Sequence, residues 1–283
     1  MTGGGSGDVW SAAAPLGGYC ERTGDAFWAE PLNALSNGIF LLAALAVFVR
    51  ARRGGCRDAG LYTLIAITVG IGVGSFLFHT LASRWAALAD VVPILLFIVA
   101  YLMLVCHRWL AFAWPWAIAA GLAYAPLSVG ARLLWREIVG GSGAPGAYLP
   151  ALLVLLICAG LLARRHHPAA RHLAAASALF ALSLAVRSLD LPLCPLVPTG
   201  THFLWHLLNG GLLYGLMRTM LRYGPVAPPA KPKVQNPDSE VSDETHHVVF
   251  TPDQVSRPPE RAADDLYAGG GDDSGLDHQR PLL

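Results

Sequence analysis

Long hydrophobic stretches alternate with short polar ones along most of the chain. Seven apolar segments can be counted, at about residues 32–49, 61–80, 88–106, 110–130, 149–163, 171–188 and 202–221. Most of them approach the roughly 20 residues that an α-helix needs to cross the hydrocarbon core of a bilayer. The pattern predicts an all-α, polytopic membrane protein built as a bundle of seven transmembrane helices.

Basic residues are distributed unevenly between the polar stretches, and this predicts the orientation. The stretches after the first, third, fifth and seventh segments hold Arg50, Arg52, Arg53, Arg57, Arg108, Arg164, Arg165, Arg171, Arg218, Arg222, Lys231 and Lys233. The alternate stretches hold fewer, namely Arg84, Arg132 and Arg136. Because cytoplasmic loops are enriched in Lys and Arg, we expect the N-terminus outside and the C-terminus in the cytoplasm. An odd number of spans requires the same arrangement.

Composition divides the chain into three expected parts. Residues 1–31 form an extracytoplasmic N-terminal segment without the basic start and apolar run of a signal peptide. Residues 32–222 form the seven-helix membrane domain. Residues 223–283 are rich in proline and charge without an amphipathic period, which is typical of a disordered cytoplasmic tail.

The overall balance of residues agrees with a membrane protein. Hydrophobic residues make up 54% of the chain and charged residues 14%, unlike an average soluble domain. A net charge of +1 implies no general attraction to nucleic acid. The high content of Ala, Arg and Gly is typical of a GC-rich genome. If the protein is bacterial, we expect it in the cell membrane, with its outer end facing the periplasm or the exterior.

Three of the ten histidines stand apart from the rest. The others lie in the tail or towards the expected cytoplasmic side: His107, His166, His167, His172, His246, His247 and His278. His79 ends the second apolar segment, whereas His202 and His206 open the seventh. The expected topology therefore brings three imidazoles to one depth on the outer side. Ionisable groups within membrane segments are functional candidates by default.

These histidines have the spacing of metal ligands. His202 and His206 lie four residues apart, hence on one face of a helix, and can offer two imidazoles to one metal. With His79 as a third ligand, a tetrahedral zinc would keep an open fourth position, as catalytic zinc sites do. Asp90 could orient or deprotonate a water there, and Ser75 shares a helix face with His79. The alternative is that all three histidines are interfacial residues without a ligand.

The outer N-terminal stretch GYCERTGDAFWAEPLNALSN (18–37) clusters Glu21, Asp25 and Glu30. Carboxylates and carbonyls gathered in this way suit a hard cation such as calcium. Alternatively, the acidic groups favour the dipole of the helix that follows, and Pro31 suits its first turn. Cys20 and Cys194 both fall on the oxidising outer side. A disulfide between them would tie this stretch to the loop before the seventh span.

Four stretches together are similar to the alkaline ceramidases, within a wider group of seven-helix membrane hydrolases that includes the progestin and adiponectin receptor proteins. They are YCERT…FWAEPLNALSN (19–37), GSFLFHTLASRWAALAD (74–90), RSLDLPLC (187–194) and THFLWHLLNG (201–210). The resemblance spans residues 19–221 and omits the tail. It implies zinc held by His79, His202 and His206, with Ser75 and Asp90 completing the catalytic site.

The same resemblance implies a calcium site in the N-terminal stretch. The matching ligands are the side chains of Glu21, Thr23 and Glu30 and the backbone carbonyl of Tyr19. Gly18 stands where the family has an acidic ligand, the loop before Glu30 is shorter, and Asp25 is a nearby substitute. The resemblance also implies a disulfide between Cys20 and Cys194.

The expected function is zinc-dependent, intramembrane hydrolysis of the amide bond in ceramide-like lipids, which releases a sphingoid base and a fatty acid. A membrane lipid is the expected partner. One alternative is a related metal-dependent hydrolase of another lipid amide or ester. A second is a receptor or transporter with zinc as a structural clamp, closed by a fourth ligand such as Cys194 if it is not paired with Cys20. A third is a structural membrane protein.

Overall fold

Nine helices account for most of the chain that the computed structural model describes, residues 18–139 and 144–224. They are α1 Pro31–Ser36, α2 Gly38–Arg53, α3 Ala59–Leu81, α4 Arg84–Arg108, α5 Trp114–Ile138, α6 Ala144–Arg164, α7 Ala170–Ser188, α8 Asp190–Leu193 and α9 His202–Tyr223. No strand occurs within these described ranges, so the predicted all-α class is confirmed. Residues 1–17 of the predicted N-terminal segment and residues 225–283 of the predicted tail, with the three histidines of the tail, lie outside the described residues.

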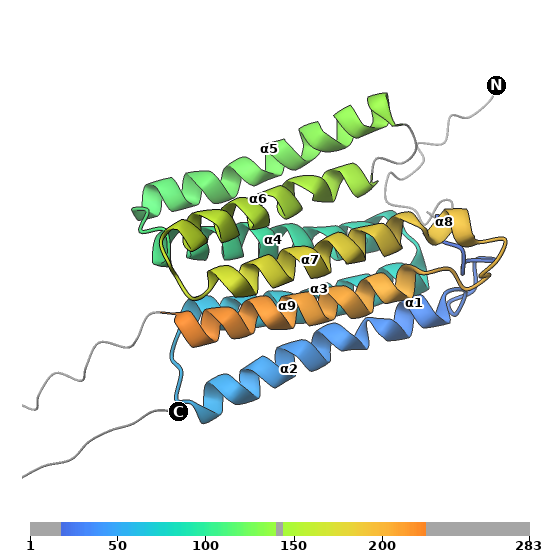
Figure 1. The fold of residues 1–283 in the computed structure, drawn as a ribbon. Helices are drawn as coiled ribbons and strands as arrows, with labels where there is room; N and C mark the ends of the chain where they lie inside the picture. Colours follow the sequence, from blue (N-terminus) through green and yellow to red (C-terminus); the bar gives the residue numbers. More distant parts are fainter. Residues whose placement is uncertain (1–17, 140–143, 225–283) are drawn as a thin grey trace, which may run out of the picture. The chain divides into compact units, whose positions relative to one another are not determined.

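The long helices pack as a ring that follows chain order (Figure 1). Each helix from α2 to α7 packs against the next one along the chain, and α9 joins α7 to α2 and so closes the ring. Helix α3 also contacts α9, and the short α1 touches both of them. Elements far apart in sequence, near residues 31, 79 and 202, therefore meet at one end of the bundle.

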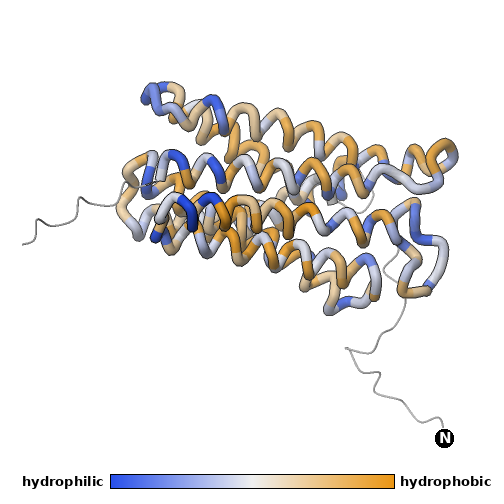
Figure 2. Tube along the Cα trace, turned by 90° about the horizontal axis from the view of Figure 1, so that it is seen from below, coloured by the Kyte–Doolittle hydropathy of each residue, from blue (hydrophilic) through white to orange (hydrophobic). Residues whose placement is uncertain are grey.

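Several of these helices suit a membrane. Five stretches are long and apolar enough to cross one: Pro31–Arg53, Ala59–Leu81, Arg84–Arg108, Trp114–Ile138 and Gly146–Arg164. Helices α7 and α9 are of similar length but carry more polar side chains. Figure 2 shows hydrophilic residues gathered towards the two ends of the bundle, with hydrophobic residues between them. These features suit a multi-pass membrane protein, whereas the count of seven spans and the orientation stay predictions.

Several helix boundaries differ from those expected from the apolar runs, and the starts of α5 and α6 are two of them. The fourth long helix, α5, begins at Trp114 rather than at residue 110, and α6 begins at Ala144 rather than at residue 149. Ala111 has a left-handed backbone (φ 59°), which breaks the helix before α5, and Pro115 then occupies the first turn, where its missing N–H costs nothing. An apolar run marks the part of a helix that avoids water, not the residue where helical hydrogen bonding starts.

A tight connection brings the end of α3 beside the start of α4. Ala82 takes a left-handed conformation (φ 44°) after α3. The hydroxyl of Ser83 then caps α4 by accepting a hydrogen bond from the backbone N–H of Ala86. At Gly74 the two helices touch, because a Cβ atom there would overlap the backbone carbonyl of Ala89.

Replacing Gly74 by alanine should force α3 and α4 apart and destabilise the protein. Overpacking of this kind typically costs about 1–3 kcal/mol. Gly70→Ala is a matched control on the same helix, because its Cβ would meet only Pro93 at an ordinary distance of 3.7 Å. Thermal unfolding in detergent should give a lower midpoint for Gly74→Ala than for Gly70→Ala. Equal midpoints would show that the close approach at Gly74 does not matter.

Candidate metal centre

Three imidazoles converge where α3 ends and α9 begins. His79 lies in the last turn of α3, and His202 and His206 face the same point from the first two turns of α9. All three are buried, and their candidate ligand nitrogens lie within 4.8 Å of one another. Within the described ranges this is the only group of three or more His, Cys, Asp or Glu residues found with such spacing.

The hydrogen bonds around the imidazoles leave nitrogens free at the centre. His79 Nδ1 is hydrogen-bonded to the carboxylate of Glu30, and Ser36 Oγ lies 2.7 Å from His206 Nδ1. His79 Nε2 is buried without a hydrogen-bond partner. A buried polar atom without a partner is costly, and a histidine anchored through one nitrogen by a carboxylate is the usual form of a metal ligand. The three residues therefore fit a metal ion.

The carboxylate of Glu30 contacts three side chains in this hydrogen-bond network. Its carboxylate accepts hydrogen bonds from Arg22 and from the Asn33 side-chain amide (3.0 Å), besides its bond to His79. Burial raises the pKa of Glu30, but the bonds from His79, Asn33 and Arg22 outweigh that effect and hold its pKa below the usual value. The carboxylate is therefore ionised near neutral pH, which suits an anchor for a metal-binding imidazole.

Replacing Glu30 by glutamine should weaken metal binding without removing a ligand. Partners of this kind typically contribute about 10–100-fold to metal affinity. Competition with a chromophoric chelator measures the change, and Glu137→Gln, an exposed glutamate on α5, serves as the control. If both variants bound metal as tightly as the unmodified protein, the contact between Glu30 and His79 would have no role in the centre.

Glu21, one of the predicted calcium ligands, has another role. Glu21 accepts the backbone N–H groups of Leu32 and Asn33, at 2.7 and 2.8 Å, and so satisfies the start of α1. This matches the alternative in which the acidic groups serve the following helix. Thr23 is exposed.

A cation of the chain itself already pairs with Glu30. The buried guanidinium of Arg22 contacts that carboxylate and donates to the carbonyl oxygens of Gly24 (3.2 Å) and His79 (2.9 Å). Calcium prefers a cage of six to eight oxygen ligands without a competing cation. Both carboxylates, those of Glu21 and Glu30, are therefore engaged by groups of the chain itself in this arrangement, and the calcium site stays a prediction.

Asp90 and Ser75 lie beside the histidine cluster. Both line a cavity of about 520 Å³ together with His202 and His206. They belong to α4 and α3, next to Ala89 and Gly74, at which these helices touch. The cavity therefore contains a carboxylate and a hydroxyl close to the candidate ligands.

A second, apolar cavity continues from this one deeper into the bundle. The two share Phe40, Ile71, Ile94, Ile98, Tyr148 and Trp205 in their linings. The remaining lining of the deeper cavity is mostly aliphatic and aromatic. The first cavity, here called the polar cavity because it holds the charged and polar groups beside the histidines, thus shares part of its lining with a hydrophobic compartment.

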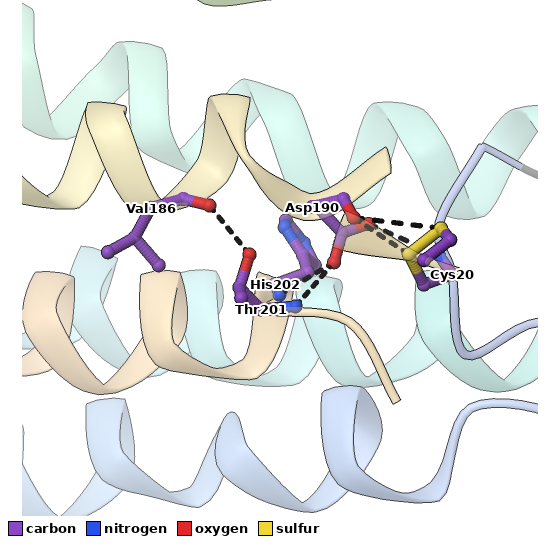
Figure 3. Close-up of a disulfide and its surroundings, with 6 residues drawn as sticks. Cys20, Val186, Asp190, Thr201 and His202 are labelled. Carbon is purple, nitrogen blue, oxygen red and sulfur yellow. Dashed lines mark hydrogen bonds between the residues drawn. A yellow bond between two sulfur atoms is a disulfide. The ribbon is translucent and has the colours of Figure 1, made fainter. Parts of the chain in front are cut away.

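The disulfide between Cys20 and Cys194 is present, as expected (Figure 3). It ties the segment before α1 to the end of α8, and it removes Cys194 as a thiolate ligand. The form of structural clamp that would use Cys194 is therefore excluded.

Asp190, which the sequence did not single out, organises the same region. Its carboxylate accepts the backbone N–H groups of Cys20 (3.1 Å), Thr201 (2.7 Å) and His202 (2.9 Å), as Figure 3 shows. Asp190 thereby fixes the first residue of α9, which is also a candidate metal ligand. Its position in the stretch RSLDLPLC, four residues before Cys194, is the feature of the sequence that could have pointed to it.

A family model described as Ceramidase matches residues 18–223. No curated protein matches the chain. The matched region is well over half of the chain and includes every helix described above and every candidate site residue.

Proposed function

Because this chain belongs to the ceramidase family, whose members are hydrolases acting on the amide bond of ceramide, we propose that it cleaves ceramide-like lipids with a zinc ion held by His79, His202 and His206. The observation that carries the proposal is the convergence of these buried imidazoles beside Asp90 and Ser75.

The donor set supports zinc among the metals. Imidazole nitrogen is a common zinc donor, and three protein ligands leave a position open for substrate or water. Bound there, zinc would act as a Lewis acid that polarises the scissile carbonyl and makes a water molecule more acidic. Glu30 and Ser36 would hold two of the imidazoles in place through their Nδ1 atoms.

We assign the proton transfers to Asp90 and the stabilisation of the oxyanion to Ser75. Asp90 takes the proton of the attacking water and later passes a proton to the nitrogen of the leaving sphingoid base. The Ser75 hydroxyl donates a hydrogen bond to the oxyanion that develops from the carbonyl. A single carboxylate thus acts first as general base and then as general acid.

The cavities support a lipid substrate. The deeper apolar cavity takes a hydrocarbon chain, whereas the amide remains in the polar cavity near the end of the bundle. If residues 32–222 cross the membrane with this end outside, the amide of a lipid in the outer leaflet reaches the centre without leaving the bilayer. In this account the protein is an intramembrane enzyme of the cell membrane.

The test is product analysis with purified protein and a panel of lipids. Ceramide should give a sphingoid base and a fatty acid in equal amounts, and a chelator should stop the reaction. Lipid esters and unrelated lipid amides form the other arms. Cleavage of one of them but not of ceramide would favour the related metal-dependent hydrolase. No cleavage of any lipid by protein that retains bound zinc would favour a receptor or transporter.

A further inference from the structure

Two arginines line the polar cavity without a carboxylate partner. Arg132 on α5 and Arg187 near the end of α7 both face it, and none of the ion pairs found within residues 18–139 and 144–224 involves either of them. Asp90 is the only carboxylate among the described residues of the lining. The cavity is therefore positive even before a metal adds its charge. Arg132 is exposed to water, whereas Arg187 is partly buried, and a charge removed from water is costly unless an opposite charge balances it.

The groups in direct contact with Arg187 are neutral, and the Asp90 carboxylate acts on it only from beyond ion-pair distance. Its guanidinium carbon lies 5.0 Å from the ring centre of Trp205 and 5.7 Å from those of Tyr19 and Tyr148. Its Nη2 donates to the hydroxyl of Tyr19 at 3.3 Å. Aromatic faces stabilise a cation only in part, and the guanidinium can still bind an anion.

The contact between Arg187 and His202 also indicates a place for an anion. Arg187 Nη1 lies 3.2 Å from His202 Nδ1. A neutral imidazole that binds a metal through Nε2 carries its hydrogen on Nδ1, and a guanidinium has only donors. Two donors would then face each other, whereas Nδ1 of His79 meets the carboxylate of Glu30. An anionic oxygen beside Arg187 and His202 would accept hydrogen bonds from both.

We propose that Arg187, assisted by Arg132, forms a subsite for an anionic oxygen group carried by a lipid. Arg132, Tyr148 and Arg187 line the same cavity, so both guanidinium groups can act on a group bound there. A guanidinium suits phosphate, sulfonate and carboxylate groups, which it can bind through two parallel hydrogen bonds. The group comes either from the headgroup of the substrate or from the carboxylate of the released fatty acid. This choice of lipids rests on the proposed function.

The test compares lipid binding to the full-length protein, stripped of metal so that nothing is cleaved. The probes are ceramide, ceramide 1-phosphate and a long-chain fatty acid in detergent micelles, followed by calorimetry. The unmodified protein should bind at least one anionic lipid about tenfold or more tightly than ceramide, since hydrogen bonds to charged groups are strong. Arg187→Gln should bind neutral and anionic lipids alike. Arg84→Gln, an exposed arginine at the start of α4 outside the cavity, should keep the preference.

The source of the anion follows from which lipid is preferred. A preference for ceramide 1-phosphate assigns the subsite to a headgroup, and a preference confined to the fatty acid assigns it to the product. Equal binding of neutral and anionic lipids by the unmodified protein, or an undiminished preference in Arg187→Gln, would overturn the proposal. If Arg187→Gln does not fold, the exposed Arg132→Gln decides, with a weaker preference expected and an unchanged one counting against the subsite.

Measuring ceramide hydrolysis by the metal-loaded protein distinguishes a failure of the anion subsite from a failure of the proposed function. Cleavage of ceramide without any preference for anionic lipids would refute the subsite and leave the proposed function intact. Tight binding of an anionic lipid without cleavage of any ceramide would refute the function and leave the subsite.

Discussion

Replacing His206 by alanine is expected to remove bound zinc and ceramide hydrolysis together. His206 is buried, supplies one of three converging nitrogens, and is held through Nδ1 by Ser36. Loss of one ligand from a site with three leaves too few donors to retain the ion. Hydrolysis should fall by at least about a thousandfold, because a Lewis acid of this kind contributes several kcal/mol to the transition state. Zinc content and sphingoid-base release are measured on the same preparation.

The matched control is a histidine away from the centre. His166 is exposed in the connection between α6 and α7 and has a left-handed backbone (φ 52°), which asparagine tolerates. His166→Asn should keep zinc and activity. If His206→Ala retained either zinc or hydrolysis at the level of this control, the three-histidine centre would be wrong.

Replacing Asp90 by asparagine should slow hydrolysis strongly but leave metal binding intact. The amide has nearly the shape of the carboxylate, so the cavity and the three imidazoles should remain. It cannot take a proton from water, and general acid–base catalysis is worth about 10²–10⁴-fold in rate. We therefore expect a fall of that size in sphingoid-base release with an unchanged zinc content.

Asp25→Asn is the control, since Asp25 is exposed in the segment before α1. It should leave both quantities unchanged. If Asp90→Asn released sphingoid base as fast as Asp25→Asn, Asp90 would be excluded as the proton carrier. A variant that lost zinc as well would show that Asp90 supports the metal rather than the proton transfers.

Much of the centre could be predicted because it depends on helix period and depth. The spacing of His202 and His206 places them on one helix face wherever that helix lies. The alternation of spans then brings His79 to the same end, and the ring formed by the helices lets α3 and α9 touch there. The helix period and the alternation of spans can both be read from the sequence without knowledge of side-chain contacts.

The contacts around the centre could not be predicted in this way. Arg187 and His202 belong to different helices, and Asp190 contacts Cys20 from 170 residues away. Such contacts depend on how each helix is rotated about its axis and on the path of the connecting loops. Glu30 was singled out only as a possible calcium ligand, whereas its contacts with His79 and with Arg22, eight residues earlier in the chain, could not be foreseen.

The most direct measurement titrates metal-free protein with zinc while the release of sphingoid base from ceramide is followed. The account predicts no activity without metal, a linear rise as zinc is added, and a plateau at about one zinc per chain, the capacity of a single centre with three protein ligands. Full hydrolysis by metal-free protein, or no hydrolysis after the site has filled, would contradict it.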